Sequence, residues 1–395
     1  MFVSRANPPD RPAVAPRSTG SWCTIGVEEE FLLVDAVTGS AISGAPEMVR
    51  LLTDEPAVTP EFLRYQVETA TPVCAGLGEV RAELDRLRRL LVGAADQVGC
   101  LVVAVGVPPF DAPPALSAVA DLPRYRELVD RFPTLLSSPG TCGCHVHVGM
   151  PSRELGVQVL SRIRPWLPQL LAVSANSPFA LGRDTGWASW RHPVWSRWPT
   201  ARPPEIWADT THYDAAVRHL VDKGAAADPR GVYWHARLSP RYPTVEVRVA
   251  DVGLSVDDAV LLAGLVRALV AIAVEEFREG RSAPAVPTAR IAAALSAAAR
   301  HGLGGPGIDV RSGEVVAQRQ LFQDLLEHLR PGLDITGDTE EVERLASGLV
   351  LGGSGADRQR QMRAASATAG EFVVALAAAT AASRAPELTV DGNDR

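Results

Sequence analysis

The order of hydrophobic and polar residues along the chain predicts strands and helices in alternation before about residue 257. Extended segments are marked by β-branched and apolar residues, since successive side chains of a strand point to opposite faces. Such segments occupy residues 22–35, 62–72, 100–106, 233–238 and 244–251. Residues 77–98 instead place apolar side chains at helical spacing, which predicts an amphipathic helix between two strands. This order predicts a mixed α/β sheet packed against helices.

After about residue 257 the pattern is helical almost to the end of the chain. We expect helices at 257–279, 288–300, 315–329, 338–350 and 357–383, and in the earlier part at 123–132 and 154–174. Residues 182–207 are rich in tryptophan and proline, too irregular for a helix and too aromatic for a plain linker. We expect an ordered loop there.

Composition and charge narrow the classes of function. The 395-residue chain is 46% hydrophobic and carries a net charge of -7, so nothing in its electrostatics predicts nucleic acid or an anionic membrane as a partner. The apolar run 259–277 contains Arg267, which favours a buried helix over a membrane span. Five scattered cysteines follow no disulfide framework and no signal peptide is evident, which predicts a cytoplasmic protein. Small molecules are the expected ligands.

The two ends of the chain differ in composition from the rest. Residues 1–21 carry many prolines with small and polar residues, and such a segment cannot bury enough apolar surface to offset its ordering entropy. We expect a disordered leader over 1–21 and a loose polar tail over 386–395.

A short strand pattern, TCGCHVHVG at 141–149, holds two histidines two positions apart. In an extended strand His145 and His147 would share one face while Cys144 and two valines occupy the other. Neutral imidazoles are good ligands for divalent metals. One alternative is a hydrogen-bonded histidine pair on a half-buried sheet. A weaker one is a zinc site with Cys142 and Cys144, whose spacing is shorter than zinc sites usually have.

The strand 22–35 carries three consecutive glutamates at its centre. With a period of two, Glu28 and Glu30 share a face and Glu29 takes the opposite one, so a polar cluster stands where a plain core strand would have valine. One explanation is an edge strand that uses charge against aggregation. The other is a carboxylate pair that holds hard cations, with Glu68 of the next strand as a third candidate ligand.

Strict alternation along 244–251 places Glu246 and Arg248 on one face of a strand. Two such residues can form a surface ion pair that contributes well under about 1 kcal/mol to stability. They can also be a metal ligand beside a phosphate contact.

The tryptophan-rich loop holds further candidates for substrate or nucleotide binding. Guanidinium groups suit carboxylates and phosphates, and indole rings suit a substrate wall or lid. The residues concerned are Arg183, Arg191, Arg197, Trp187 and Trp190. The alternative is a loop that is packed down by its own aromatic side chains.

Together these strands offer a set of acidic side chains and one imidazole for cations. The candidate ligands are Glu28, Glu30, Glu68, His145 and Glu246. Carboxylate-rich sites with one imidazole suit magnesium, with manganese as the other fitting ion, and several carboxylates in one place need more than one cation. About two or three magnesium ions bridging the phosphates of ATP, with arginine at the transferred phosphoryl group, would be the natural use.

The same residues carry a resemblance to a known family. The stretches TIGVEEEFLLVD, QVETATPVC, TCGCHVHVGMP, SANSPFALGRDTGWASWR, VWSRWPT and TVEVRVADVGLSVDDAVLLAGLVRALV resemble the carboxylate-amine ligases, or type 2 glutamate-cysteine ligases, of the glutamine synthetase superfamily. The resemblance runs from about Thr24 to about Ala382, so 22–385 is expected to be a single catalytic domain. It implies an α+β fold with a curved, largely antiparallel sheet, the active site on its concave face, helices outside, and often a homodimer.

The resemblance also implies roles for individual residues. Glu28, His145 and Glu246 would bind one magnesium, and Glu30 with Glu68 would bind others. Among the catalytic candidates, Arg248 would stabilise the phosphoryl group, and His147 and Arg237 would lie close to substrate or phosphate.

The implied reaction has two steps: ATP phosphorylates a carboxylate to an acyl phosphate, and an amine then displaces phosphate. Glutamate and cysteine are the default substrates, but another acid and amine pair fits the same motifs. One departure from the family pattern is Gly253, where cysteine is common. The competing hypotheses are a metal-dependent hydrolase and a phosphotransferase acting on a guanidino group.

Overall fold

The computed structural model describes residues 22–113, 115–133 and 139–383, and for 115–116 the backbone only. The expected leader (1–21) and tail (386–395) lie outside the described residues.

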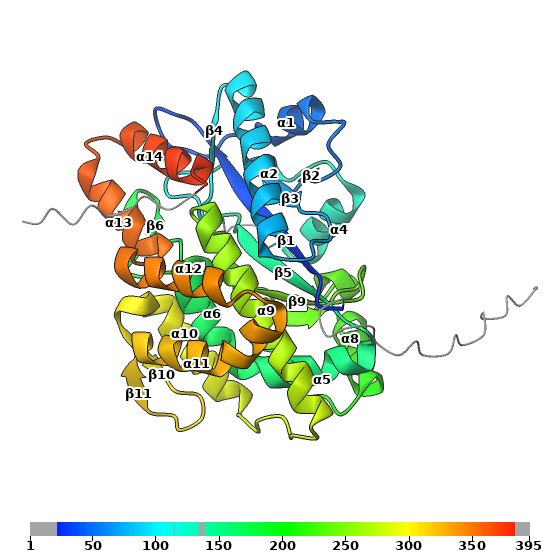
Figure 1. The fold of residues 1–395 in the computed structure, drawn as a ribbon. Helices are drawn as coiled ribbons and strands as arrows, with labels where there is room; N and C mark the ends of the chain where they lie inside the picture. Colours follow the sequence, from blue (N-terminus) through cyan, green and yellow to red (C-terminus); the bar gives the residue numbers. More distant parts are fainter. Residues whose placement is uncertain (1–21, 114, 134–138, 384–395) are drawn as a thin grey trace, which may run out of the picture.

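One antiparallel sheet forms the centre of the molecule (Figure 1). The sheet has the order β2-β3-β1-β5-β9-β8, with β4 also paired to β1, and every pairing in it is antiparallel. The strands are β1 (Ile25–Val34), β2 (Val58–Pro60), β3 (Gln66–Ala70), β4 (Leu101–Val103), β5 (Gly143–Gly149), β8 (Ala236–Leu238) and β9 (Thr244–Asp251). Two hairpins stand apart from it, β6 (Phe179–Ala180) with β7 (Arg183–Asp184) and β10 (Pro306–Ile308) with β11 (Val315–Ala317).

The strand with three glutamates is central. β1 pairs with β3 along one side and with β5 and β4 along the other. The edge-strand explanation of its charges is therefore wrong, because both of its hydrogen-bonding edges are occupied.

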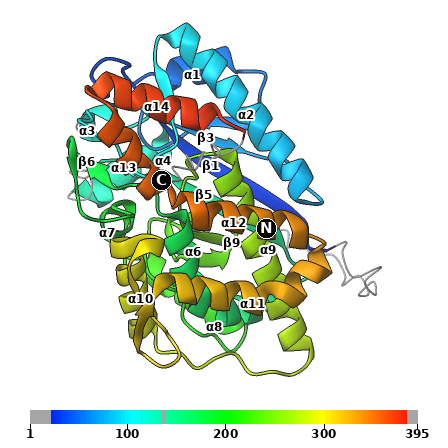
Figure 2. The same cartoon turned by 60° about the vertical axis from the view of Figure 1, so that its left-hand side comes forward.

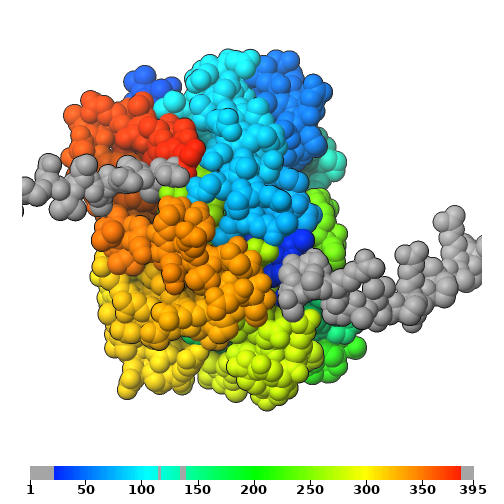
Figure 3. All heavy atoms as spheres, in the orientation of Figure 1, coloured from blue at the N-terminus to red at the C-terminus, as the bar shows by residue number. Residues whose placement is uncertain are grey.

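Helices surround this sheet. They are α1 (Ala45–Leu51), α2 (Leu77–Val98), α3 (Ala115–Ala118), α4 (Pro123–Arg131), α5 (Arg153–Ile163), α6 (Leu167–Ser174), α7 (Arg191–Trp195), α8 (Thr210–Asp222), α9 (Val256–Arg278), α10 (Thr288–His301), α11 (Gln318–Thr336), α12 (Thr339–Gly352), α13 (Gly355–Ala365) and α14 (Ala369–Ala381). Of these, α4 and α7 contribute side chains to a pocket on one face of the sheet, whereas a layer of others packs on the opposite face. In the space-filling view, α2, α11 and α12 leave little of the sheet visible from this side (Figure 3). Turned by 60°, α14 is seen beside α2 (Figure 2).

The central helix α9 is buried along most of its length, which confirms the expectation of a buried helix. Its one interior cation, Arg267, lies 2.9 Å from Asp338 (Nη1 to Oδ2) and donates hydrogen bonds to the carbonyl oxygens of Cys23 and Ala75. A buried guanidinium is tolerated when its donors are satisfied in this way. Among the described residues, no helix is both long and apolar enough to cross a membrane.

Several helix predictions need correction. The helix expected at 154–174 divides into α5 and α6 around a 3₁₀ turn, Arg164–Trp166, because Pro165 and Pro168 lack the amide hydrogen that a continuous helix needs. The helix expected at 357–383 is also two helices, and α14 begins at the cap residue Thr368, whose side chain accepts a hydrogen bond from the backbone N–H of Glu371.

Other differences concern the bounds of predicted segments and elements that were not predicted. The loop expected over 182–207 contains the short helix α7, and residues 315–317 form β11 before α11 starts. The elements that were not predicted from the sequence include α1, α3, α8, β2 and the hairpins β6–β7 and β10–β11.

The two faces of the sheet have different chemistry. The odd-numbered residues Val27, Glu29 and Phe31 of β1 lie on the helix side together with Cys144 and Val146 of β5, within the hydrophobic core. The even-numbered glutamates and the odd-numbered histidines face the other way and line a pocket. The sheet thus holds Glu28, Glu30 and the two histidines away from the helical layer, while Glu29 faces it and pairs with Arg88 of α2.

Candidate active site

Strands β1 and β5 bring two glutamates and two histidines into contact. In the β1–β5 pairing Glu28 stands opposite His145, and Gly26 stands opposite His147. One carboxylate reaches both rings: Glu28 Oε2 lies 3.3 Å from His145 Nδ1, and Glu28 Oε1 lies 3.3 Å from His147 Nε2. Burial disfavours the charge on Glu28, yet the two histidines hold its pKa below the usual range. The predicted sharing of a face by His145 and His147 is confirmed.

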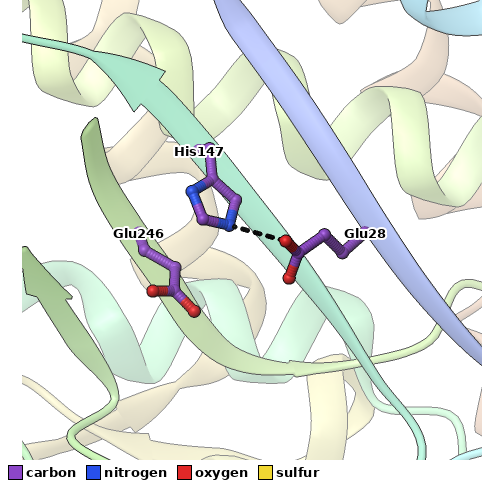
Figure 4. Close-up of side chains that lie close together, drawn as sticks. All are labelled: Glu28, His147 and Glu246. Atoms are coloured by element: carbon purple, nitrogen blue, oxygen red, sulfur yellow. Dashed lines mark ion pairs between the residues drawn. The ribbon is translucent and has the colours of Figure 1, made fainter. Parts of the chain in front are cut away.

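Glu246 of β9 completes one side of the site. Figure 4 shows Glu28, His147 and Glu246 pointing toward one another from three adjacent strands. Arg237 Nε donates to Glu246 Oε2 at 2.8 Å, and Arg248 also contacts this carboxylate. Burial alone would raise the pKa of Glu246, but the two guanidinium groups hold it well below its usual range.

Glu68 of β3 lies opposite Glu30 of β1, so the third predicted carboxylate also reaches the site. Beside them lies Glu61, which the sequence analysis missed. Burial and the neighbouring charge of Glu30 raise the pKa of Glu61 to about 8, and burial with Glu61 raises the pKa of Glu68. Glu61 precedes the strand and has no periodic pattern around it, so no local signal in the sequence identifies it.

Among the residues that the structure describes, three overlapping groups of side chains could hold a metal ion, each with ligand atoms within 4.8 Å of one another. They are Glu28 with His147 and Glu246, Glu28 with Glu68 and His145, and Glu30 with Glu61 and Glu68. Ionised carboxylates only accept hydrogen bonds, and crowded carboxylates repel one another. Two groups with one imidazole each and a third of carboxylates alone therefore suit hard divalent cations such as Mg²⁺.

The grouping differs in one respect from the ligand set implied by the resemblance. His147, not His145, joins Glu28 and Glu246, while His145 joins Glu28 and Glu68. Arg248 Nη1 lies 3.4 Å from His145 Nδ1, which places a cation between His145 and Glu246. His147 is thus a further candidate ligand, and its expected role near substrate or phosphate stays a prediction.

Arg237 and Arg248 have different surroundings. Arg237 bridges Glu246 and two backbone carbonyls, those of Arg230 and Val232, so its donors serve to hold Glu246 in place. Arg248 is half-buried and lies next to both Glu246 and His145. Of the two, Arg248 has the position from which a guanidinium can meet an anionic ligand beside the cation groups.

These side chains line a cavity of about 300 Å³. Such a volume is at the lower end of ligand sites, so a nucleotide would extend out of it. Arg191 and Arg197, two residues predicted from the tryptophan-rich loop, are part of its lining. Arg191 is buried, stacks over the Trp195 ring at 4.8 Å, and donates a hydrogen bond to the carbonyl of Val249.

Three other candidates from this loop are not part of the pocket lining over the described residues. Arg183 is exposed on β7. Trp187 packs against Trp190 with ring centroids 5.9 Å apart, and the Arg300 guanidinium lies over Trp187. The geometry therefore favours a packing role for the two tryptophans, the alternative considered for this loop.

The pocket also contains residues that sequence patterns did not identify. Its aromatic wall includes Tyr125 of α4, Trp195 and Trp198 of the tryptophan-rich loop, Tyr233 before β8, and Tyr242 in the β8–β9 turn. Local periodicity gives no signal for them, because each comes from a loop or a short helix that only the tertiary fold brings to the sheet.

The zinc alternative does not fit the geometry. Cys144 lies in the core on the opposite face from His145 and His147, and burial raises its pKa well above the usual range. Cys142 is likewise buried and accepts a hydrogen bond from Gln66. A thiol that stays protonated on the wrong side of a strand is not a zinc ligand.

Comparisons with known proteins agree with this architecture. The family model "Glutamate-cysteine ligase family 2" matches residues 24–377. "Putative glutamate--cysteine ligase 2-1" of Saccharopolyspora erythraea is 45% identical over 341 residues, covering 86% of this chain and 90% of the relative. A protein of the same name from Nocardia farcinica is 42% identical over 366 residues, with coverages of 92% and 95%.

The three-dimensional structure is also similar to solved structures. The glutamate-cysteine ligase of Francisella tularensis, solved in complex with AMP, superposes with a TM-score of 0.70 at 13% identity, covering 92% of this chain and 89% of that one. The antiparallel sheet with its helical layer is thus the fold of known ligases. On the family model and the curated relatives, the chain belongs to glutamate-cysteine ligase family 2.

Proposed function

We propose that this protein is an ATP- and magnesium-dependent ligase that joins a carboxylate to an amine through an acyl phosphate. The single observation that carries the proposal is the convergence of five glutamates, two histidines and Arg248 from four neighbouring strands and the segment before β3 into one pocket. Family membership supports the reaction class. Crowded carboxylates next to a guanidinium are the arrangement that phosphoryl transfer from ATP needs.

The side chains of the pocket include suitable ligands for the magnesium ions that the reaction needs. Glu28, His147 and Glu246 would hold one ion, and Glu30, Glu61 and Glu68 another. Bound Mg²⁺ would neutralise the negative charge of the phosphates, which the negatively charged carboxylates cannot do themselves. Arg248 would stabilise negative charge on the transferred phosphoryl group, since a preorganised cation in a partly buried site stabilises developing charge strongly.

The second half of the reaction needs an amine held close to the activated acyl carbon. Positioning of this kind accounts for a large share of the rate in bimolecular reactions. Tyr125, Trp198 and Tyr233 form an aromatic part of the lining, which would help to restrict both substrates to one orientation. L-glutamate and L-cysteine are the default pair, because the curated relatives carry these substrates in their names.

The experiment is an ADP-release screen of carboxylic acids against amines with Mg²⁺ present and with Mg²⁺ removed. Glu30→Gln is the matched control, since the amide keeps the oxygen that accepts the backbone N–H of Gly143 and removes the charge. Mass spectrometry should find an amide product. No acid and amine pair releasing ADP above the control would contradict the proposal, whereas a phosphorylated guanidine or a product of hydrolysis without ATP would indicate one of the competing reactions.

The expected homodimer and cytoplasmic location belong to the same proposal. Light scattering coupled to size-exclusion chromatography measures the first, and a mass of one chain would contradict it. Fractionation of cells that express the protein measures the second.

A further inference from the structure

Tyr242 differs from the other aromatic side chains of the pocket. Within the described part of the chain, the remaining aromatics of the lining are buried or half-buried, whereas Tyr242 is 55% exposed. Phe62 packs on Tyr125 and Trp198 packs on Tyr233, with ring centroids 5.2 Å apart in both pairs. Tyr242 thus leaves ring surface open at the mouth of the pocket.

The turn that carries Tyr242 is held firmly. Pro240 and Pro243 flank the tip, and proline fixes one backbone angle of each. The hydroxyl of Ser239 accepts hydrogen bonds from the backbone N–H groups of Arg241 and Tyr242 at 3.3 Å. The backbone N–H of Met150 donates to the Pro243 carbonyl at 2.8 Å, which ties the turn to the end of β5. These contacts hold the backbone of the turn in place, so Tyr242 projects from a firmly held segment.

The ring stands at one end of the candidate cation groups. Its centroid lies 6.1 Å from that of His147, with the two planes at 83°, and His147 belongs to the group with Glu28 and Glu246. The group with Glu30, Glu61 and Glu68 lies toward β3.

Toward β3 the lining of the pocket includes the buried side chains of Leu63, Gln66 and Leu128. At the opposite end Arg241 and Tyr242 are exposed. A triphosphate that spans the cation groups can therefore place its nucleoside, its largest part, beside this exposed turn.

We propose that Tyr242 is the stacking platform for the nucleobase, so that the nucleotide occupies the β8–β9 end and the acid and amine occupy the β3 end. This inference rests on the proposed function. A flat π-system presented on a rigid turn beside a phosphate site is suited to a base, because every base offers a π-face and stacking needs no further ordering of the protein.

The test separates the base from the phosphates. Binding of MgADP and of magnesium tripolyphosphate is measured by calorimetry for the wild type, Tyr242→Ala, Tyr242→Leu and Tyr242→Phe. We expect Tyr242→Ala to weaken MgADP about tenfold, in the range measured for loss of one base-stacking aromatic. Tyr242→Phe should stay within about twofold, Tyr242→Leu should fall between them, and tripolyphosphate affinity should be the same in all four.

Phe277→Ala is the matched control, since Phe277 is 42% exposed and lies outside the lining of this pocket. Equal MgADP affinity in Tyr242→Ala and the wild type overturns the platform while leaving the proposed function intact. Equal losses for ADP and tripolyphosphate also overturn it, because the residue would then act on the phosphates. A wild type that binds neither ligand would remove the proposed function and this inference together.

Discussion

The two faces of β1 show two ways of keeping glutamates in a protein interior. On the helix side, Glu29 is fully buried and meets Arg88 in a bidentate pair at 2.5 and 3.0 Å. Arg88 also donates to the carbonyls of Gly253, Leu254 and Thr380, so both charges are satisfied within the protein. On the pocket side, Glu30 lies among Glu61 and Glu68 without an arginine partner of this kind in the described structure.

The difference teaches how to tell a structural charge from a functional one. A buried carboxylate whose cation comes from the same chain holds elements together, here β1, α2 and the end of α14. Carboxylates crowded together without such cations leave a negative site that a ligand must neutralise. Strand β1 carries a carboxylate of each kind at neighbouring positions, Glu29 and Glu30.

The largest effect should come from removing the cation on the helix side. Arg88→Met would leave Glu29 buried without a partner, and we expect the free energy of unfolding to fall by about 3–5 kcal/mol. Chemical denaturation measures this. The double variant Glu29→Gln/Arg88→Met should recover most of the loss, and a single variant that costs under about 1 kcal/mol would show that the pair is not structural.

On the pocket side, a cation bound from solution should stabilise the carboxylates that have no arginine partner. With free Mg²⁺ at 100 times its dissociation constant, we expect the wild type to gain about 2.7 kcal/mol of stability. Glu68→Gln removes a member of two candidate cation groups and should lose most of that gain. Thermal melts with and without Mg²⁺ measure both. Equal stabilisation of the wild type and Glu68→Gln would show that magnesium binds elsewhere.

The crowded carboxylates also predict a pH dependence of the metal-free protein. Burial and Glu30 raise the folded-state pKa of Glu61 from 4.5 to about 8, so between these values the folded state binds the proton more tightly than the unfolded state. Its contribution to stability is complete below pH 4.5 and is lost as the pH rises toward 8, with a slope of at most about 1.4 kcal/mol per pH unit.

The control for this pH dependence is Glu61→Gln. It is needed because buried histidines titrate in an overlapping pH range and also change how the free energy of unfolding depends on pH. Burial lowers the pKa of His192 to about 4, which makes its contribution rise with pH. The difference in unfolding free energy between the wild type and Glu61→Gln isolates the glutamate, and a difference that does not change from pH 5 to pH 8 would contradict the prediction.

Much of the sheet was predictable, because alternation fixes which side chains share a face once a strand is identified. The separation of Glu29 from Glu28 and Glu30, and of the histidines from Cys144, follows from a period of two and is observed. The bounds of α2 and β9 also agree with the sequence pattern.

What could not be predicted depends on distances between segments far apart in the chain. The proximity of His147 to Glu28 and Glu246 depends on the register of β5 against β9, which shifts at an irregularity between Cys144 and Val146. Glu61 and Tyr242 come from irregular segments, where side-chain direction follows no period. Helix ends near Pro165 and Thr368 were misplaced because apolar spacing continues across the break.

The smallest effect should come from the loop residue that the fold leaves outside the pocket. Arg183 is exposed on the β6–β7 hairpin, so Arg183→Ala should change the kcat/KM for ADP release by less than about twofold, as a surface substitution away from the site does. Arg197→Ala is the informative partner, since Arg197 lines the pocket in the same loop. It should raise the KM of a substrate several-fold, because a guanidinium beside an anionic ligand contributes to binding. Equal effects of both substitutions would mean that the loop moves as a unit, and that its position in this structure does not decide which arginine meets the substrate.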